Sequence, residues 1–307
     1  MKLLLAIPVL NPGRHAEALV SAIRHQRRPP DEMLILDSES TDGAVTRFAD
    51  IGARIVRVPR AEFDHGATRN LALRASDADV VLFLTQDAIP DDAQAFGALV
   101  DALTRNPRAG VAFGRQLPHR GATLAATHGR LFNYPARSFT RTRDDLARLG
   151  VRATFCSNSF AAYRRTAAAE VGWFPERQIF GEDAALCARL LAAGWEVEYV
   201  ADACVRHSHD YTVREEVARY FDLGVFHATD AQYRALAGSP AGEGMKFVRA
   251  ELAFFRAHAG VHTWPALVAR NGMRWLGYQL GRRQRLLPRP LRARLGMNKG
   301  FWRRAEA

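Results

Sequence analysis

A single apolar run constrains the fold of this chain more than any other part of its sequence. The run Val80-Val81-Leu82-Phe83-Leu84 ends abruptly at Thr85-Gln86-Asp87. Such a run is typical of a strand that is buried on both faces of a parallel sheet. Asp87 is then expected just past the carboxyl end of the strand, where open α/β sheets bind their ligands. Turn chemistry before Pro90 explains this aspartate equally well, so Asp87 alone leaves both interpretations open.

The first 211 residues alternate strand and helix signals, as a doubly wound sheet requires. The expected strands are residues 3–7, 33–36, 55–58, 80–84, 111–114, 159–163 and 197–200. The expected helices are residues 16–25, 67–75, 93–104 and 182–193. The sequence therefore predicts an α/β, Rossmann-like fold in which a mixed, mainly parallel sheet is flanked by helices.

After Tyr211 only helical signals remain. Thr212 with Glu215 three residues later is a capping-box pattern, which predicts the start of a helix. We therefore expect two domains, an α/β domain at residues 1–211 and a helical, basic extension at residues 212–307.

The extension contains two further helical signals. A helix is expected to begin at Ser239-Pro240, and an apolar stripe at helical spacing predicts another over residues 264–278. Such a stripe is more typical of core than of a membrane contact, although the arginines that follow it reduce this preference. Regular structure is expected to end at Pro288 and Pro290.

The positive charge of the chain lies almost entirely at one end. The net charge is +11, and residues 270–307 contain 11 of the 43 Lys and Arg residues against one acid, Glu306. Residues 1–269 are close to neutral, with 32 basic and 31 acidic residues. A basic tail on a neutral body favours an anionic membrane surface as partner over nucleic acid, whose binding is an alternative.

The cysteines and the hydropathy of the chain indicate the cellular compartment in which the protein is expected. Cys156, Cys187 and Cys204 are odd in number and form no C-x-x-C pair, which fits a reducing cytoplasm. No apolar run approaches the roughly 18 residues that span a bilayer. We expect a cytoplasmic protein that can attach to the inner face of the cell membrane.

Polar side chains also follow the first strands and begin the helices between them. The loop from Pro8 to Arg14 contains one glycine, so the dinucleotide fingerprint and the P-loop are absent, as is the glycine-rich loop of sugar-nucleotide nucleotidyltransferases. Asp37 and Ser38 follow the second strand, where a carboxylate can accept from a base or a ribose hydroxyl, or form an Asx turn. Arg69 lies on a helix start that could hold a diphosphate, or it could simply point outward.

Acidic and histidine residues complete the set. Glu182 and Asp183 open a helix, and adjacent helical residues point about 100° apart, so only one of them can face a given site. His207 and His209 share a face of an extended segment and could contribute a ligand to a divalent metal. A zinc site that adds Cys204 is disfavoured by the tight spacing and the missing fourth ligand.

In their order along the chain these motifs resemble those of inverting glycosyltransferases of family 2, which have the GT-A fold. The resemblance covers residues 1 to about 210 and is closest to bacterial rhamnosyltransferases. The segments that carry it are Phe63-Asp64-His65-Gly66-Ala67-Thr68-Arg69-Asn70, Leu84-Thr85-Gln86-Asp87-Ala88 and His207-Ser208-His209, with Trp275-Leu276-Gly277-Tyr278 and Phe301-Trp302 near the end.

This resemblance implies a role for each candidate residue. The nucleotide-sugar pocket would be formed by Pro8, Leu10, Asp37, Ser38, Arg69, Gln86 and Asp87. Asp87 and His207 would bind a divalent metal, Mg²⁺ or Mn²⁺. Thr85 stands at the first position of the family's D-x-D motif, which leaves the metal with one aspartate where relatives use two.

The resemblance also assigns the remaining chemistry. Asp183 would be the base that deprotonates the acceptor, with Glu182 in reserve, while Trp173, Asn158 and His209 would contact the acceptor. The implied activity moves a sugar, expected to be rhamnose from dTDP-rhamnose, from a nucleoside diphosphate donor to a saccharide or lipid-linked saccharide in cell-surface polysaccharide synthesis. The alternatives are a sugar-nucleotide nucleotidyltransferase and a nucleic-acid-binding protein.

Overall fold

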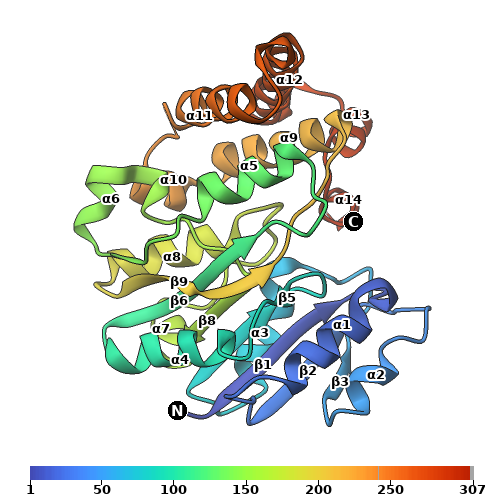
Figure 1. The fold of residues 1–307 in the computed structure, drawn as a ribbon, viewed down its shortest axis with the longest axis vertical. Coiled ribbons are helices and arrows are strands. Elements are labelled where there is room, and N and C mark those ends of the chain that lie inside the picture. Colours follow the sequence, from blue (N-terminus) through green and yellow to red (C-terminus); the bar gives the residue numbers. More distant parts are fainter. Residues whose placement is uncertain (241, 305–307) are drawn as a thin grey trace.

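The computed structural model describes residues 1–240 and 242–304, and a nine-stranded sheet forms its centre (Figure 1). The strand order is β3-β2-β1-β4-β8-β6-β9-β5, and β7 pairs with β9. The strands are β1 (Leu3–Val9), β2 (Glu32–Asp37), β3 (Arg54–Arg57), β4 (Val80–Leu84), β5 (Ile89–Pro90), β6 (Ala109–Leu117), β7 (Phe139–Arg141), β8 (Phe160–Arg164) and β9 (Glu196–Arg206).

The sheet is mixed. The four strands β3, β2, β1 and β4 run parallel, as do β6 and β9, whereas β8 is antiparallel to both β4 and β6. The short strands β5 and β7 pair antiparallel with β9. The prediction of a mixed, mainly parallel sheet is confirmed.

Helices cover both faces of the sheet because alternate residues of the central strands point to opposite sides. Leu3 and Leu5 pack with α1 and α4 on one face, whereas Leu4 and Ala6 pack with α3 and α8 on the other. The helices of this part are α1 (Gly13–Arg24), α2 (Thr46–Ala49), α3 (His65–Arg74), α4 (Ala95–Arg105), α5 (Leu124–Asn133), α6 (Asp144–Leu149), α7 (Arg165–Glu170) and α8 (Glu182–Ala192).

After β9 the described elements are all helical, and α11 and α12 form the end of the molecule farthest from β1–β3 (Figure 1). These helices are α9 (Val213–Thr229), α10 (Ala231–Ala237), α11 (Glu243–His258), α12 (Trp264–Arg282), α13 (Arg289–Leu295) and α14 (Lys299–Arg304). The capping box at Thr212 and Glu215 is present at the start of α9. No helix among the described residues combines the length and apolar character needed to cross a bilayer.

Two predictions for the extension need correction. Pro288 and Pro290 do not end regular structure, because α13 follows with a proline in its first turn, where the missing N–H costs nothing. The helix expected to begin at Ser239-Pro240 begins at Glu243 instead.

The α12 helix packs on α9 through glycines. A Cβ atom on Gly281 would lie 2.0 Å from the carbonyl oxygen of Phe221, and one on Gly224 would lie 2.2 Å from that of Tyr278. The two backbones therefore approach more closely than any larger side chain would allow. This contact fixes one face of α12 firmly on the body of the protein.

Candidate active site

A cavity of about 650 Å³ lies at the carboxyl ends of β1 and β4. Parallel strands bring their carboxyl ends to one edge of a sheet, so loops that are distant in sequence meet there. The predicted residues that line this cavity are Pro8, Leu10, Ser38, Arg69, Gln86, Asn158, Glu182 and Asp183. The fold thus joins residues from six separate segments around one space.

Five predicted residues do not line the cavity. Asp87, His207 and His209 form a separate cluster, described below, whereas Asp37 and Trp173 have other roles. Asp37 accepts a hydrogen bond from the backbone N–H of Ser40 at 3.0 Å, which shapes the loop after β2. Trp173 has a left-handed backbone with φ of 66° and packs against the core beside α3 and α8. The structure therefore gives Trp173 a packing role and does not bring it to the cavity.

Gln86 joins the loops that follow β1 and β4. Its Oε1 accepts from the backbone N–H of Leu10 at 2.8 Å, and its Nε2 donates to the carbonyl oxygen of Leu10 at 3.1 Å. This two-way contact holds both loops at the cavity edge. Asp87, the next residue, is positioned by the same contact.

Glu182 is engaged in a buried ion pair. Its Oε1 lies 3.1 Å from an Arg69 guanidinium nitrogen and accepts from the Asn158 amide, also at 3.1 Å. Burial is the largest influence and opposes ionisation of Glu182, but the charge of Arg69, together with His65 and the Asn158 hydrogen bond, keeps the pKa below its ordinary value. Glu182 is therefore an ionised partner that orients Arg69.

Asp183 has the opposite electrostatic situation. Burial, followed by the negative charge of Glu182, raises the pKa of Asp183 to about 7. Its carboxylate accepts from the backbone N–H groups of Ala184 at 2.8 Å and Asn158 at 3.3 Å, and no cation pairs with it among the described residues. A carboxylate that titrates near neutrality at the edge of a cavity can act as a general base.

Gly181 sets the start of the helix that carries both acids. Its φ is 77°, in the left-handed region, and a Cβ there would lie 2.7 Å from the ring of Phe226 on α9. Both observations favour glycine at this position. The start of α8 is thereby packed tightly against the helical extension.

Asp87, His207 and His209 form a cluster beside Gln86. One Asp87 carboxylate oxygen lies 3.4 Å from Nε2 of His207 and 3.7 Å from Nε2 of His209. The three candidate ligand atoms lie within 4.8 Å of one another. His209, which the resemblance assigned to the acceptor, thus groups with the two residues expected to bind metal.

The protonation of His207 suits a metal ligand. Gln116 Oε1 accepts from Arg130 at 2.6 Å and lies 2.8 Å from Nδ1 of His207, so we assign the ring proton to Nδ1 from these partners. Burial lowers the pKa of His207, and burial with the nearby His207 lowers that of His209 to about 4, so both rings are neutral at pH 7.

The lone pair on Nε2 of His207 then faces Asp87. A lone pair and a carboxylate oxygen 3.4 Å apart repel one another unless a cation lies between them. Two imidazoles and a carboxylate therefore fit a divalent metal.

The sequence did not predict the far wall of the cavity or the residue that orients His207. Gln116 lies on β6 beyond the expected strand end, and only a longer alternating pattern would have indicated it. The far wall comes from the extension and contains Arg219, Asp222, Met297, Asn298, Lys299, Gly300 and Arg303. These residues carry no local motif that points to a site.

Two carboxylates hold this wall in place, Asp222 within the extension and Asp64 on the side of the α/β part. Asp222 accepts from the backbone N–H groups of Met297 at 2.9 Å and Asn298 at 2.8 Å. Arg304 donates to the carbonyl oxygen of Phe63 and lies 3.4 Å from Asp64, which also caps α3. Arg304, at the end of α14, is thereby fixed beside the helix that carries Arg69.

Comparison with known sequences gives one family and two close relatives. Residues 5–172 match the family described as glycosyl transferase family 2. The chain is 41% identical over 305 residues to the O-antigen chain rhamnosyltransferase RfbN of Salmonella typhimurium, covering 98% of this chain and 96% of the relative. It is 38% identical over 301 residues to the O-antigen chain rhamnosyltransferase WbaN of Salmonella anatum, covering 97% and 95%.

Solved structures with the same arrangement include two sugar-nucleotide complexes. The mannosyltransferase PcManGT from Pyrobaculum calidifontis, in complex with GDP-Man and Mn²⁺, matches with a TM-score of 0.62 and 18% identity over 91% of this chain and 87% of that one. Glucosyl-3-phosphoglycerate synthase from Mycobacterium tuberculosis, with Mn²⁺ and UDP-glucose, matches with a TM-score of 0.51 and 21% identity over 78% and 82%. At these identities the likeness is one of fold.

Proposed function

Because the chain belongs to glycosyl transferase family 2, we propose that it transfers rhamnose from dTDP-rhamnose to a saccharide, with inversion, during synthesis of a cell-surface polysaccharide. It is a glycosyltransferase, and the GT-A fold expected from the sequence is confirmed. Rhamnose as the sugar is supported by the two O-antigen rhamnosyltransferases that align with nearly the whole chain.

One observation carries the mechanism. Asp183 lies in the same cavity as Gln86 and Pro8. Its pKa is raised, and no cation pairs with it among the described residues, whereas Glu182 forms an ion pair with Arg69. Of the two carboxylates, Asp183 is therefore the one available to take a proton. We assign it as the base that deprotonates the acceptor hydroxyl as it attacks the anomeric carbon.

The donor side is formed by the strand-end loops. Pro8, Leu10, Ser38 and Arg69 form the pocket for the nucleotide, with Asp37 shaping its rim. Asp87, His207 and His209 would hold Mn²⁺ or Mg²⁺, and a cation bound there supplies positive charge for the diphosphate leaving group. Arg69 adds a second positive charge on the cavity wall.

The acceptor side is assigned to Asn158 and the extension. The names of the relatives favour an O-antigen-type chain as acceptor. We propose that this chain is lipid-linked, which would place the reaction at the cytoplasmic face of the cell membrane. We divide the protein accordingly into a catalytic domain at residues 1–211 and a helical extension at residues 212–307 that completes the cavity.

A donor panel tests this function. Purified enzyme would be incubated with dTDP-rhamnose, UDP-glucose or GDP-mannose, a lipid-linked saccharide acceptor, and Mn²⁺ or Mg²⁺, and release of nucleoside diphosphate would be measured. We expect dTDP-rhamnose to give the highest turnover and chelation by EDTA to abolish it. Preferred turnover of another donor would overturn rhamnose while leaving glycosyl transfer intact.

A further inference from the structure

The side of α12 that faces away from α9 is apolar and uncovered. Val268, Met273, Trp275 and Leu276 lie on this side, and we call these four residues the outer face of α12. Trp275 is 64% exposed and Val268 57% exposed, values more typical of polar surface residues. Leu286, just after the helix, is 79% exposed.

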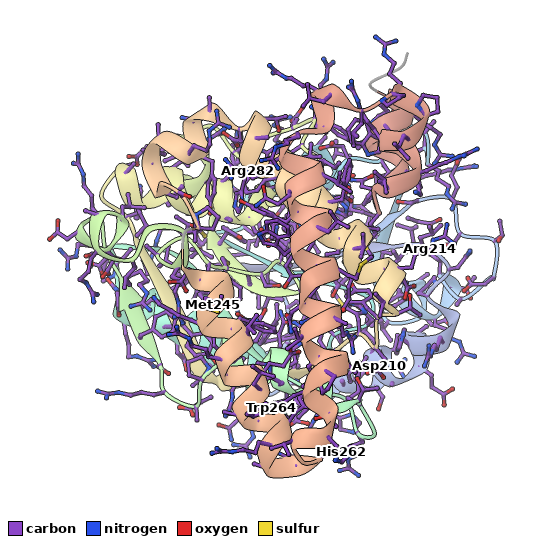
Figure 2. The ribbon with its side chains drawn as sticks, turned by 90° about the horizontal axis from the view of Figure 1, so that it is seen from above. Asp210, Arg214, Met245, His262, Trp264 and Arg282 are labelled. Carbon is purple, nitrogen blue, oxygen red and sulfur yellow. The ribbon has the colours of Figure 1, made fainter. Side chains whose placement is uncertain are left out.

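The outer face is held rigidly, because the other sides of α12 are fixed to the body. Gly281 contacts the backbone of α9, as described above, and a Cβ on Gly277 would lie 2.6 Å from the carbonyl oxygen of Val217 on the same helix. Arg274 pairs with Glu251 of α11 at 3.2 Å, and Arg270 pairs with Glu216 of α9 at 2.6 Å. Figure 2 shows α12 outermost at this end of the molecule, with α11 beside it. The apolar residues are therefore displayed on a fixed helix.

The charge around the outer face has one sign. Between Leu252 and Ala305 the sequence contains no Asp or Glu and twelve Lys or Arg residues. Arg282, Arg283, Arg285 and Arg289 follow the outer face, are exposed, and take part in none of the salt bridges formed by the described residues. The surface thus joins apolar side chains to unpaired positive charge.

Apolar side chains beside positive charge favour one of two possible partners for this surface, a second copy of the chain or a lipid bilayer. A second copy of the chain packed on the same face about a two-fold axis would bring arginines against arginines, which is unfavourable. An anionic lipid surface accepts the apolar side chains, takes Trp275 at the headgroup level and neutralises the arginines. We propose that the outer face of α12 and the four arginines after it form a docking surface for anionic lipid bilayers.

Vesicle cosedimentation of the full chain tests the surface. The enzyme would be mixed, without donor or acceptor, with vesicles of phosphatidylcholine alone or with added phosphatidylglycerol. We expect binding to the anionic vesicles that weakens as salt is raised, and little binding to phosphatidylcholine alone. Because no substrate is present, the result does not depend on the proposed reaction.

Two double variants separate the apolar and charged contributions. Trp275→Ser with Leu276→Ser should weaken vesicle binding about tenfold or more, through lost apolar burial. Arg283→Gln with Arg285→Gln should weaken it about 25-fold, since each cation near an anionic surface contributes about fivefold.

Matched controls lie elsewhere on the surface. Leu131→Ser removes an apolar residue of similar exposure to Leu276, and Arg105→Gln with Arg143→Gln removes two exposed arginines; neither should change binding. Melting curves would verify that each variant is folded. Equal vesicle binding by wild type and both α12 variants would overturn the proposal, as would a dimer in light scattering that the serine variants dissociate without any vesicle binding.

Discussion

Buried charge is arranged in opposite ways at the cavity and at the junction of α9, α11 and α12. At the junction, Glu251 is fully buried, and its carboxylate accepts from Asn271 at 2.6 Å and from Arg274. Glu216 pairs with both Arg270 and Arg274. Each carboxylate there has two donors.

At the cavity and the neighbouring histidine cluster, two carboxylates are left incompletely paired. Asp183 has no cationic partner among the described residues, and Asp87 faces the lone pair of a neutral histidine. An uncompensated buried charge is costly to a fold, so its persistence at one edge of the sheet indicates chemistry, whereas complete pairing indicates structure. The following changes test that distinction, from the largest expected effect to the smallest.

The substitution Asp183→Asn should lower the transfer rate by about 10³-fold, because it removes the proposed base. Thermal stability should stay equal or rise at pH 8. The folded-state pKa of Asp183 is raised, so its contribution to stability is full below the ordinary pKa of an aspartate and is lost as pH rises through about 7. Initial rates and melting curves measure the two effects. Normal turnover in this variant would move the assignment to Glu182, whose Gln variant would then be examined.

The substitution Glu251→Gln should lower stability and leave the transfer rate nearly unchanged, the reverse of the effects expected for Asp183→Asn. It removes the charge of one of the two carboxylates that pair with the buried Arg274 guanidinium, while Glu216 remains, and the free energy of unfolding should fall by about 2 kcal/mol. The rate per folded molecule should change little, because Glu251 does not line the cavity. Denaturant titration gives the stability, and Asp77→Asn, which breaks the exposed pair with Lys2, is the matched control. Unchanged stability in Glu251→Gln would contradict the conclusion that the paired charges at the junction stabilise the fold.

The substitution Gln116→Leu should weaken Mn²⁺ binding by about 10- to 100-fold. Gln116 orients His207, and partners of this kind typically change metal affinity by that amount. Mn²⁺ titration followed by electron paramagnetic resonance, without substrates, measures the affinity directly. The exposed Gln94→Leu is the control. Equal affinities would mean that the hydrogen bond to Gln116 does not position the histidine.

The pH dependence of kcat/KM should report the raised pKa of Asp183. The base is active when deprotonated, so kcat/KM should fall about tenfold for each unit below pH 7 and level off above it. A pH series between 5 and 8.5 with saturating Mn²⁺ measures the profile. A midpoint near 4 would show a carboxylate with an ordinary pKa and would remove the electrostatic contrast with Glu182.

Most of the sheet could be predicted because buried parallel strands have continuous apolar sequences. The runs that form β1 and β4 have this character, and residues at their carboxyl ends converge by geometry alone. The choice between Glu182 and Asp183 could not be predicted, because it depends on Arg69, which is more than one hundred residues away in sequence.

The extension shows a second limit. The periodicity of residues 264–278 correctly predicts a helix, yet the stripe divides in the structure: Leu267 is buried, while Val268 and Trp275 are exposed. Periodicity identifies which residues share a face and contains no information on what covers it. The far wall of the cavity was missed for the same reason, since only tertiary contacts bring Met297 and Arg303 beside Asp183.

The position of this wall has a consequence for protein synthesis. All nine strands have been translated once Arg206 is added to the chain, but the wall residues Met297 to Arg303 are translated only near the end of the message. A chain released early, by a nonsense codon in the α13 region, would contain the sheet and the proposed base and still lack a closed cavity. The nascent enzyme is therefore unable to enclose a sugar nucleotide until almost every codon has been read.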